Sequence, residues 1–401
     1  MTLEPAVLVL EDGTRYPGHA YGARGRTVGE VVFATGMTGY QETLTDPSYA
    51  GQIVVMTAPH IGNTGVNDED PESSRIWVSG YVVRDPSRVV SNHRATGSLD
   101  DELVSEGVVG ISGIDTRAVT RRLRDAGAMR GGVFSGPDAL LTPDEQLDLV
   151  RGAAAMAGRN LSAEVSTVDG YVVPATGDPL GRLAVLDLGV KTSTLNYLAA
   201  RGFDVHVLPQ SVTLDELLGI DPVAVFYSNG PGDPAASDQH VELLRGVLRQ
   251  GLPFFGICFG NQLLGRALGY GTYKLPFGHR GINQPVVDVE TGRTEITSHN
   301  HGFAVDAPIG VVSESPAGFG RVEVAARHLR VLLQDDRTAG AHHQAGHALV
   351  QREWSAGLAA GVEIDLLVVG VRLLVHQAQR PAGAEQQLDR AAQDALQQRL
   401  Q

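Results

Sequence analysis

Residues 254–264 read Phe-Phe-Gly-Ile-Cys-Phe-Gly-Asn-Gln-Leu-Leu. The short apolar run at the start predicts a buried strand, and residues 261–268 predict a helix. Between them Cys258 stands two residues after one glycine and two before another, which is the layout of a nucleophile elbow with cysteine in place of serine. Glycines at these positions let the strand and the helix approach closely. The stretch therefore predicts a strand–turn–helix unit with a functional thiol at the turn.

The predicted position of Cys258 favours chemistry at its sulfur. Unpaired N–H groups at a helix N-terminus favour the thiolate, and the N–H of Phe259 would point to where an oxyanion forms. The alternative is a buried structural thiol, which is a common role for cysteine. Cys258 is the only cysteine among 401 residues, and its place in the elbow favours the nucleophile.

Composition narrows the class of protein. A single cysteine rules out an internal disulfide, so nothing indicates an oxidising compartment. Residues 1–5 do not resemble a signal peptide, and the apolar run at 366–375 is too short for a membrane span. A net charge of −14 argues against nucleic acid or an anionic membrane as partner. We expect a cytoplasmic protein.

Residues 183–257 alternate short apolar runs with helical patterns. This alternation predicts a parallel sheet covered by helices on both faces. Ligands of such sheets bind at the carboxyl ends of the strands, where both Cys258 and the loop 228–234 lie. Gly230 and Gly232 would let backbone N–H groups approach a carboxylate or an oxyanion. The alternative is a plain Pro-Gly turn.

The first 181 residues carry a different pattern. Residues 7–21 predict a hairpin around an Asp-Gly turn, and residues 115–126 and 142–156 predict helices. The loop 35–49 is rich in turn and cap residues and is either functional or an ordinary connection. Residues 166–181 are rich in Gly, Pro, Thr and Asp and predict an interdomain linker.

Two histidines invite a metal-site interpretation. His299 and His301 share one face of a predicted strand, but no cysteine or carboxylate joins them with ligand spacing. The sequence therefore predicts no metal site.

With these features named, residues 1 to about 325 resemble the small, glutamine-hydrolysing subunit family of carbamoyl-phosphate synthetases. Three motifs are shared by class I glutamine amidotransferases generally: Asn229–Asp233 (Asn-Gly-Pro-Gly-Asp), Gly256–Gln262 (Gly-Ile-Cys-Phe-Gly-Asn-Gln) and Asn300–Phe303 (Asn-His-Gly-Phe). Five others resemble the small subunit alone: Thr38–Glu42, Thr45–Tyr49, His60–Asn63, Gly113–Arg117 and Asp187–Lys191.

The resemblance implies an α/β fold in two parts. Residues 1–165 would form a mixed α/β domain of the small-subunit type, followed by the linker at 166–181. Residues 182–325 would form a doubly wound, mostly parallel class I amidotransferase domain. Residues 326–401 depart from the family as an atypical tail.

The resemblance also implies a reaction. Cys258 would attack the amide carbon of glutamine to give a thioester and ammonia, and water would release glutamate. Backbone groups near Gly232 and Phe259 would stabilise the oxyanion. The positions that would hold glutamine are Ser48, Gly230, Gly232, Phe259, Gln262, Asn300, Gly302 and Phe303. Because Ser48 belongs to the amino-terminal domain, that domain would close over the site.

Ammonia would pass to a separate large subunit in a heterodimer. That subunit would bind ATP and Mg and use bicarbonate to make carbamoyl phosphate for arginine and pyrimidine biosynthesis. This chain would carry no cofactor, since it contains no P-loop or ATP-grasp segment.

The family's base, a histidine in a His-Pro-Glu motif, is absent from the sequence. The one His-x-Glu, His240–Glu242, lies on a predicted helix in the wrong place. Three explanations are open: a change of reading frame near residue 325, which we favour, a divergent tail with another base, or loss of glutaminase activity. We expect an impaired glutaminase, and the alternative is a non-catalytic, partner-binding subunit. A cysteine hydrolase of the α/β-hydrolase type would need a later Asp…His pair, which is not found.

Overall fold

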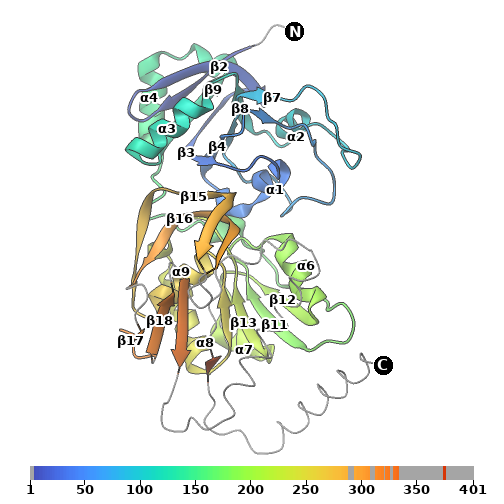
Figure 1. Ribbon diagram of the computed structural model, residues 1–401, viewed down its shortest axis with the longest axis vertical. Helices are drawn as coiled ribbons and strands as arrows, with labels where there is room; N and C mark the ends of the chain where they lie inside the picture. The colour runs from blue at the N-terminus through green and yellow to red at the C-terminus, as the bar shows by residue number, and fades with distance from the viewer. Residues whose placement is uncertain are drawn as a thin grey trace, which may run out of the picture.

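The computed structural model describes residues 4–287, 293–307, 312–319, 321–325, 328–333 and 374–375. They form an amino-terminal barrel unit and a sheet unit, and a long two-stranded ribbon lies between the two (Figure 1). The predicted α/β fold is therefore confirmed. The predicted domain boundaries stay predictions, and most of the tail at 326–401 lies outside the described residues.

The barrel unit is built on seven strands that close in the order β1-β2-β8-β6-β4-β3-β9. The strands are β1 (Pro5–Leu10), β2 (Arg15–Gly22), β3 (Arg26–Ala34), β4 (Gln52–Met56), β6 (Gly80–Val82), β8 (Val109–Ser112) and β9 (Met129–Ser135). The pairs β3–β4, β4–β6 and β6–β8 are parallel, and the others are antiparallel. β1 and β2 form the predicted hairpin. Leu8, Val31 and Ile53 are among the buried side chains that pack together in this unit.

Helices and short segments surround the barrel. They are α1 (Tyr40–Thr45), η1 (Pro47–Tyr49), α2 (Leu99–Ser105), α3 (Thr116–Ala126), η2 (Gly136–Leu140), α4 (Pro143–Gly152) and α5 (Ser162–Val165), with the pair β5 (His60–Ile61) and β7 (Asp85–Pro86). The side chain of Asp115 caps α3 by accepting from the N–H of Ala118, which confirms the helix predicted there. α4 ends earlier than predicted, because the chain at Ala153 turns to extended backbone.

The second unit is a five-stranded sheet in the order β10-β12-β11-β13-β14. Its strands are β10 (Tyr171–Val173), β11 (Gly181–Leu186), β12 (Phe203–Leu208), β13 (Ala224–Tyr227) and β14 (Phe254–Gly256). β11 to β14 pair in parallel as predicted, and β10 is antiparallel to β12. The linker expected at 166–181 thus contains an edge strand. Because two of its three side chains are exposed, the strand has no buried face that an alternating pattern would reveal.

Four helices cover this sheet: α6 (Thr192–Ala200), α7 (Leu214–Gly219), α8 (Asp238–Arg249) and α9 (Phe259–Ala267). Leu244 and Leu263 pack with α7 on one core, which includes Tyr227 of β13. Leu195 and Leu198 of α6 pack on a second core with other residues of the sheet. Helices therefore cover both faces, as in a doubly wound sheet.

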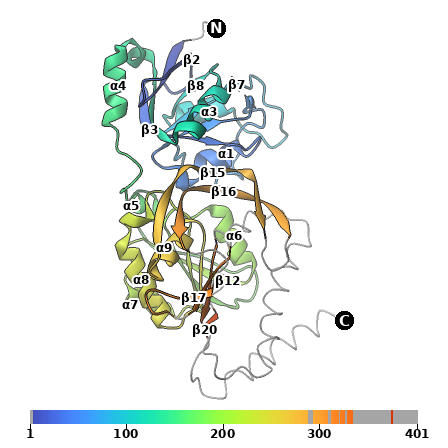
Figure 2. The same cartoon turned by 60° about the vertical axis from the view of Figure 1, so that its left-hand side comes forward.

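The ribbon consists of β15 (Gly271–Val287) and β16 (Thr294–Asp306) and crosses between the two units (Figure 2). The ring of Phe277 stacks on Phe33 of the barrel at 5.8 Å between centroids. Beyond it, β17 (Val312–Glu314), β18 (Arg321–Ala325), β19 (His328–Leu333) and β20 (Leu374–Val375) form a small sheet. Within the described residues, no helix has both the length and the apolar character that a membrane crossing requires.

The tight contact between α9 and β13 gives a stability prediction. A Cβ on Gly260 would lie 2.3 Å from the carbonyl oxygen of Tyr227, a backbone atom that cannot swing away. We expect Gly260→Ala to lower the free energy of unfolding by about 1–3 kcal/mol, measured by urea denaturation.

The matched control is Gly152→Ala at the end of α4, where a Cβ meets nothing within 4 Å. That variant should unfold at the wild-type urea concentration or slightly above it. Equal midpoints for the two variants would contradict the proposed close approach.

Candidate functional site

Cys258 lies at the turn between β14 and α9, as the elbow pattern predicts. Its backbone has φ 51° and ψ −103°. Among the described residues, it shares a positive φ with only one other non-glycine residue, Asp221. Such strain is tolerated where the surroundings impose it, and it often marks a functional site.

The surroundings of Cys258 favour the protonated thiol. Its Sγ donates to the carbonyl oxygen of Asn300 at 3.3 Å. Burial, followed by the carboxylate of Asp46, raises the pKa of the Cys258 thiol to about 12. The Phe259 N–H and the cations Arg280 and Lys191 lower that pKa but do not offset burial. The thiolate expected from the helix N-terminus is therefore not what this environment favours.

A cleft of about 340 Å³ opens beside the sulfur and gathers most of the predicted site residues. Those that line it are Ser48, Gly230, Gly232, Cys258, Gln262, Asn300, Gly302 and Phe303. Phe259 does not line it; its side chain is buried, and its backbone N–H faces the sulfur. The structure thus brings together residues from η1, the loop after β13, α9 and β16.

Ser48 reaches the cleft through paired hydrogen bonds. The N–H of Ser48 donates to Oδ1 of Asp46 at 2.9 Å, and Nδ2 of Asn229 donates to Ser48 Oγ at 2.9 Å. The same Asn229 amide group donates to the carbonyl oxygen of Gly189 at 2.8 Å. Nδ2 of Asn300 donates to the other carboxylate oxygen of Asp46 at 3.0 Å. The barrel unit therefore forms one wall of the cleft.

The opposite wall is fixed around the carbonyl oxygen of Phe303. It accepts from Nε2 of Gln262 at 2.8 Å and pairs with Nδ1 of His301 at 2.9 Å. Gln262 thus ties α9 to β16. Its amide holds the wall in place, since its NH₂ group is already engaged.

Arg280 is a cleft residue that the sequence analysis missed. It is 3% exposed, it lines the cleft, and its Nη1 donates to the carbonyl oxygen of Phe277 at 2.8 Å. Its Nε has no hydrogen-bond partner among the described residues. A Cβ on Gly302 would lie 3.0 Å from its Nη2, which places the guanidinium against this cleft residue. A single arginine within a strand pattern gives no sequence signal for such a role.

A second cleft, of about 570 Å³, meets Cys258 from another side. Asp46, Lys191, Tyr197 and His299 are among its lining residues. Nζ of Lys191 lies 3.7 Å from a carboxylate oxygen of Asp46 and 3.9 Å from one of Glu72. Cys258 thus lines two cavities, which the sequence pattern did not indicate.

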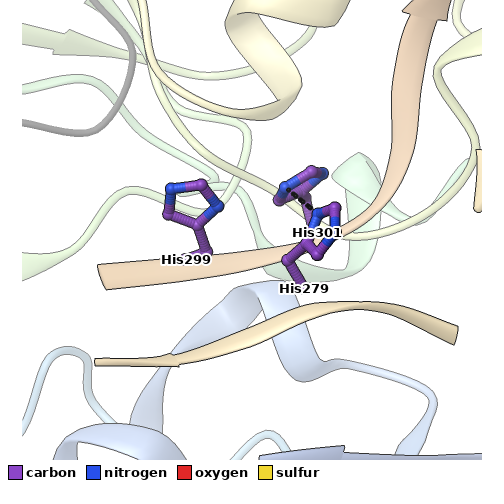
Figure 3. Close-up of side chains that lie close together, drawn as sticks. All are labelled: His279, His299 and His301. Atoms are coloured by element: carbon purple, nitrogen blue, oxygen red, sulfur yellow. Dashed lines mark hydrogen bonds between the residues drawn. The ribbon is translucent and has the colours of Figure 1, made fainter. Parts of the chain in front are cut away.

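Three histidines of the ribbon lie together near the cleft wall that contains Phe303, as Figure 3 shows. His279 comes from β15, and His299 and His301 come from β16. One ligand atom from each lies within 4.8 Å of the other two. Among the described residues, these three histidines are the group that could hold a metal ion.

His240 of the lone His-x-Glu does not take part in the site. Its side chain is buried on α8, its Nε2 lies 3.0 Å from Oε1 of Gln210, and it lines neither cleft. Burial lowers the pKa of His240 to about 4, so it stays neutral. The histidines of the tail lie outside the described residues.

Comparisons with known proteins agree with this geometry. Residues 8–133 match the family model for the carbamoyl-phosphate synthase small chain, CPSase domain. Residues 184–330 match the model for class-I glutamine amidotransferase. The two matched regions correspond to the barrel unit and to the sheet unit with its ribbon.

Curated relatives extend the likeness over most of the chain. The carbamoyl phosphate synthase small chain of Streptomyces coelicolor is 61% identical over 336 residues, which are 84% of this chain and 87% of the relative. The one from Bifidobacterium longum is 57% identical over 84% of this chain and 86% of its own length. The one from Mycobacterium tuberculosis is 54% identical, with shares of 85% and 95%. This chain belongs to the carbamoyl phosphate synthase small chain family.

Proposed function

We propose that this chain is the glutamine-hydrolysing subunit of a carbamoyl-phosphate synthase. In this proposal Cys258 converts glutamine to glutamate and ammonia, and the ammonia passes to a large subunit. The large subunit binds ATP and Mg and makes carbamoyl phosphate from bicarbonate for arginine and pyrimidine biosynthesis. The convergence of Ser48, Asn300 and Gly302 on one cleft beside Cys258 carries the proposal.

The chemistry of the cleft supports glutamine as the ligand. Arg280 lines the cleft and presents a buried cation whose Nε–H has no hydrogen-bond partner among the described residues, which suits the α-carboxylate of an amino acid. An ion pair with this carboxylate would also offset the cost of desolvation, which lowers the pKa of the Arg280 guanidinium.

The proposed reaction has two balanced steps. In the first, the Cys258 sulfur bonds to the carboxamide carbon, the C–N bond breaks, and the thiol proton leaves with the nitrogen as ammonia. In the second, water attacks the thioester and the C–S bond breaks, which gives the glutamate carboxylate, returns one proton to sulfur and releases the other to solvent or to ammonia. In this proposal the Phe259 N–H, which lies next to Sγ, donates to the oxyanion of both tetrahedral intermediates.

The thiol environment sets the rate in this proposal. A pKa of about 12 leaves only about one thiol in 10⁵ ionised at pH 7. The chain is therefore a slow glutaminase unless a base is supplied to Cys258. The hydrogen bond from Sγ to Asn300 also favours the second candidate function, a subunit that binds its partner but makes no ammonia.

Turnover with the large subunit tests the proposed function. Glutamate release by the purified complex should be slow and should be abolished by Cys258→Ser. A diazo-ketone analogue of glutamine should label wild-type Cys258, detected by mass spectrometry. Complex formation without turnover and without labelling would instead favour the non-catalytic subunit.

The state of the thiol gives a pH prediction. Because the pKa of Cys258 is raised, the thiolate fraction should increase about tenfold for each pH unit throughout the range from about 7 to 10. Alkylation by iodoacetamide, which reports on this single cysteine, should follow the same slope. The chain unfolded in urea is the control, and its rate should level off near the ordinary pKa of about 8.5. A plateau near that pKa in the folded protein would show that the thiol is not shielded as described.

Arg280 gives a third prediction for this site. Arg280→Met should raise the KM for glutamine about tenfold or more, because a charged hydrogen bond to the carboxylate is lost. The KM of Arg280→Lys for glutamine should fall between the values for the wild type and for Arg280→Met. The control is Arg121→Met on the exposed face of α3. An unchanged KM in folded Arg280→Met would show that the guanidinium does not bind the substrate.

A further inference from the structure

The register of the ribbon places three imidazoles on one face. His279 of β15 pairs directly with His301 of β16, and His299 stands opposite Gly281. Side chains at i and i+2 of a strand point to the same face, so His299 joins the other two. The spacing of His299 and His301 alone did not indicate a site, because the third member comes from the neighbouring strand.

The separations of the rings fit coordination of one ion. The ring centroids lie 4.9 Å apart for His279–His301, 5.4 Å for His299–His301 and 6.1 Å for His279–His299. With Zn–N distances of about 2.0–2.1 Å and tetrahedral angles, three bound imidazoles have centroids about 5 Å apart. The three rings therefore need only small rotations to face a common point.

Hydrogen bonding prepares His301 as a ligand. Its Nδ1 lies 2.9 Å from the carbonyl oxygen of Phe303, so Nδ1 carries the proton and Nε2 carries the lone pair. A carbonyl partner of this kind orients many metal-binding histidines.

His279 completes a pair with His301. Its Nδ1 lies 3.1 Å from Nε2 of His301, a separation close to that of two nitrogens bound to one ion (Figure 3). Without an ion, the proton on Nδ1 of His279 makes this contact a hydrogen bond. Moving that proton to the other ring nitrogen of His279 leaves two lone pairs aimed at one position, with no change in charge.

An ion can reach the site, and the charges around it limit its affinity. His301 lines the first cleft and His299 lines the second. The net charge of −14 favours the approach of cations. The Arg280 guanidinium is close enough to act on the His301 ring, and its charge opposes a divalent ion. The site should therefore bind more weakly than a closed structural zinc site.

We propose that His279, His299 and His301 form a binding site for one divalent transition-metal ion of the Zn²⁺ class. Three neutral imidazoles suit Zn²⁺ and Co²⁺ and leave a fourth position open. The ion cross-links β15 to β16 at the wall that carries Asn300 and Gly302. Its binding does not depend on glutamine hydrolysis.

The test is titration of the untagged full-length chain with Co²⁺, followed by displacement with Zn²⁺. The wild type should bind one equivalent, with the intense visible absorption of four-coordinate Co²⁺. His299→Gln and His279→Gln should each weaken binding about tenfold or more. Zn²⁺ should also raise the melting temperature of the wild type and leave that of the two variants nearly unchanged.

Three controls isolate the site. His93→Gln, at an exposed loop position, and Cys258→Ser should both bind Co²⁺ as the wild type does. A variant with His342, His343, His347 and His376 all changed to Gln tests the tail and should also keep the site. Wild-type affinity in both folded ribbon variants, or loss of binding in the tail variant instead, would overturn the proposal.

Discussion

One carboxylate, that of Asp46, holds the two units together at the cleft. It is 3% exposed, accepts from the N–H of Ser48 and from Nδ2 of Asn300, and lies 3.7 Å from Nζ of Lys191. A buried charge needs such partners, because leaving it uncompensated costs several kcal/mol. Together with the hydrogen bond from Asn229, these contacts hold Ser48 in the cleft wall. The Asp46 carboxylate therefore links η1 of the barrel unit to Asn300 of β16 beside Cys258.

The same carboxylate opposes ionisation of the sulfur. After burial, it is the next cause of the rise in the Cys258 pKa to about 12. A helix N-terminus contributes about 0.3–1 kcal/mol toward a thiolate, which is too little to reverse that rise. The same burial and the same carboxylate that close the site therefore disfavour ionisation of the Cys258 thiol. A glutaminase built on this frame needs a further group that removes the proton.

The sequence predicted the elements that are determined by neighbouring residues in the chain. The glycines around Cys258 predicted the elbow, and the alternation in residues 183–257 predicted the parallel sheet. Ser48 was linked to the site only by family resemblance, because it meets Asn229 across 181 positions of sequence. The role of His279 depends on the register of the ribbon, which no spacing within β16 reveals. The sequence could not predict how far the pKa of the Cys258 thiol is raised, because burial is a tertiary property.

The ribbon of β15 and β16 also joins the sheet unit to the barrel unit by noncovalent contacts. By chain order β15 and β16 belong with the sheet unit, yet they pack on the barrel through Phe277 and Phe33 and through the ion pair of Lys274 with Glu30. Residues 176–180, which connect β10 to β11 in the sheet unit, are exposed. A peptide bond cut there severs the backbone but none of these contacts. The nicked protein should therefore migrate as one particle in a native gel and as two fragments once denatured.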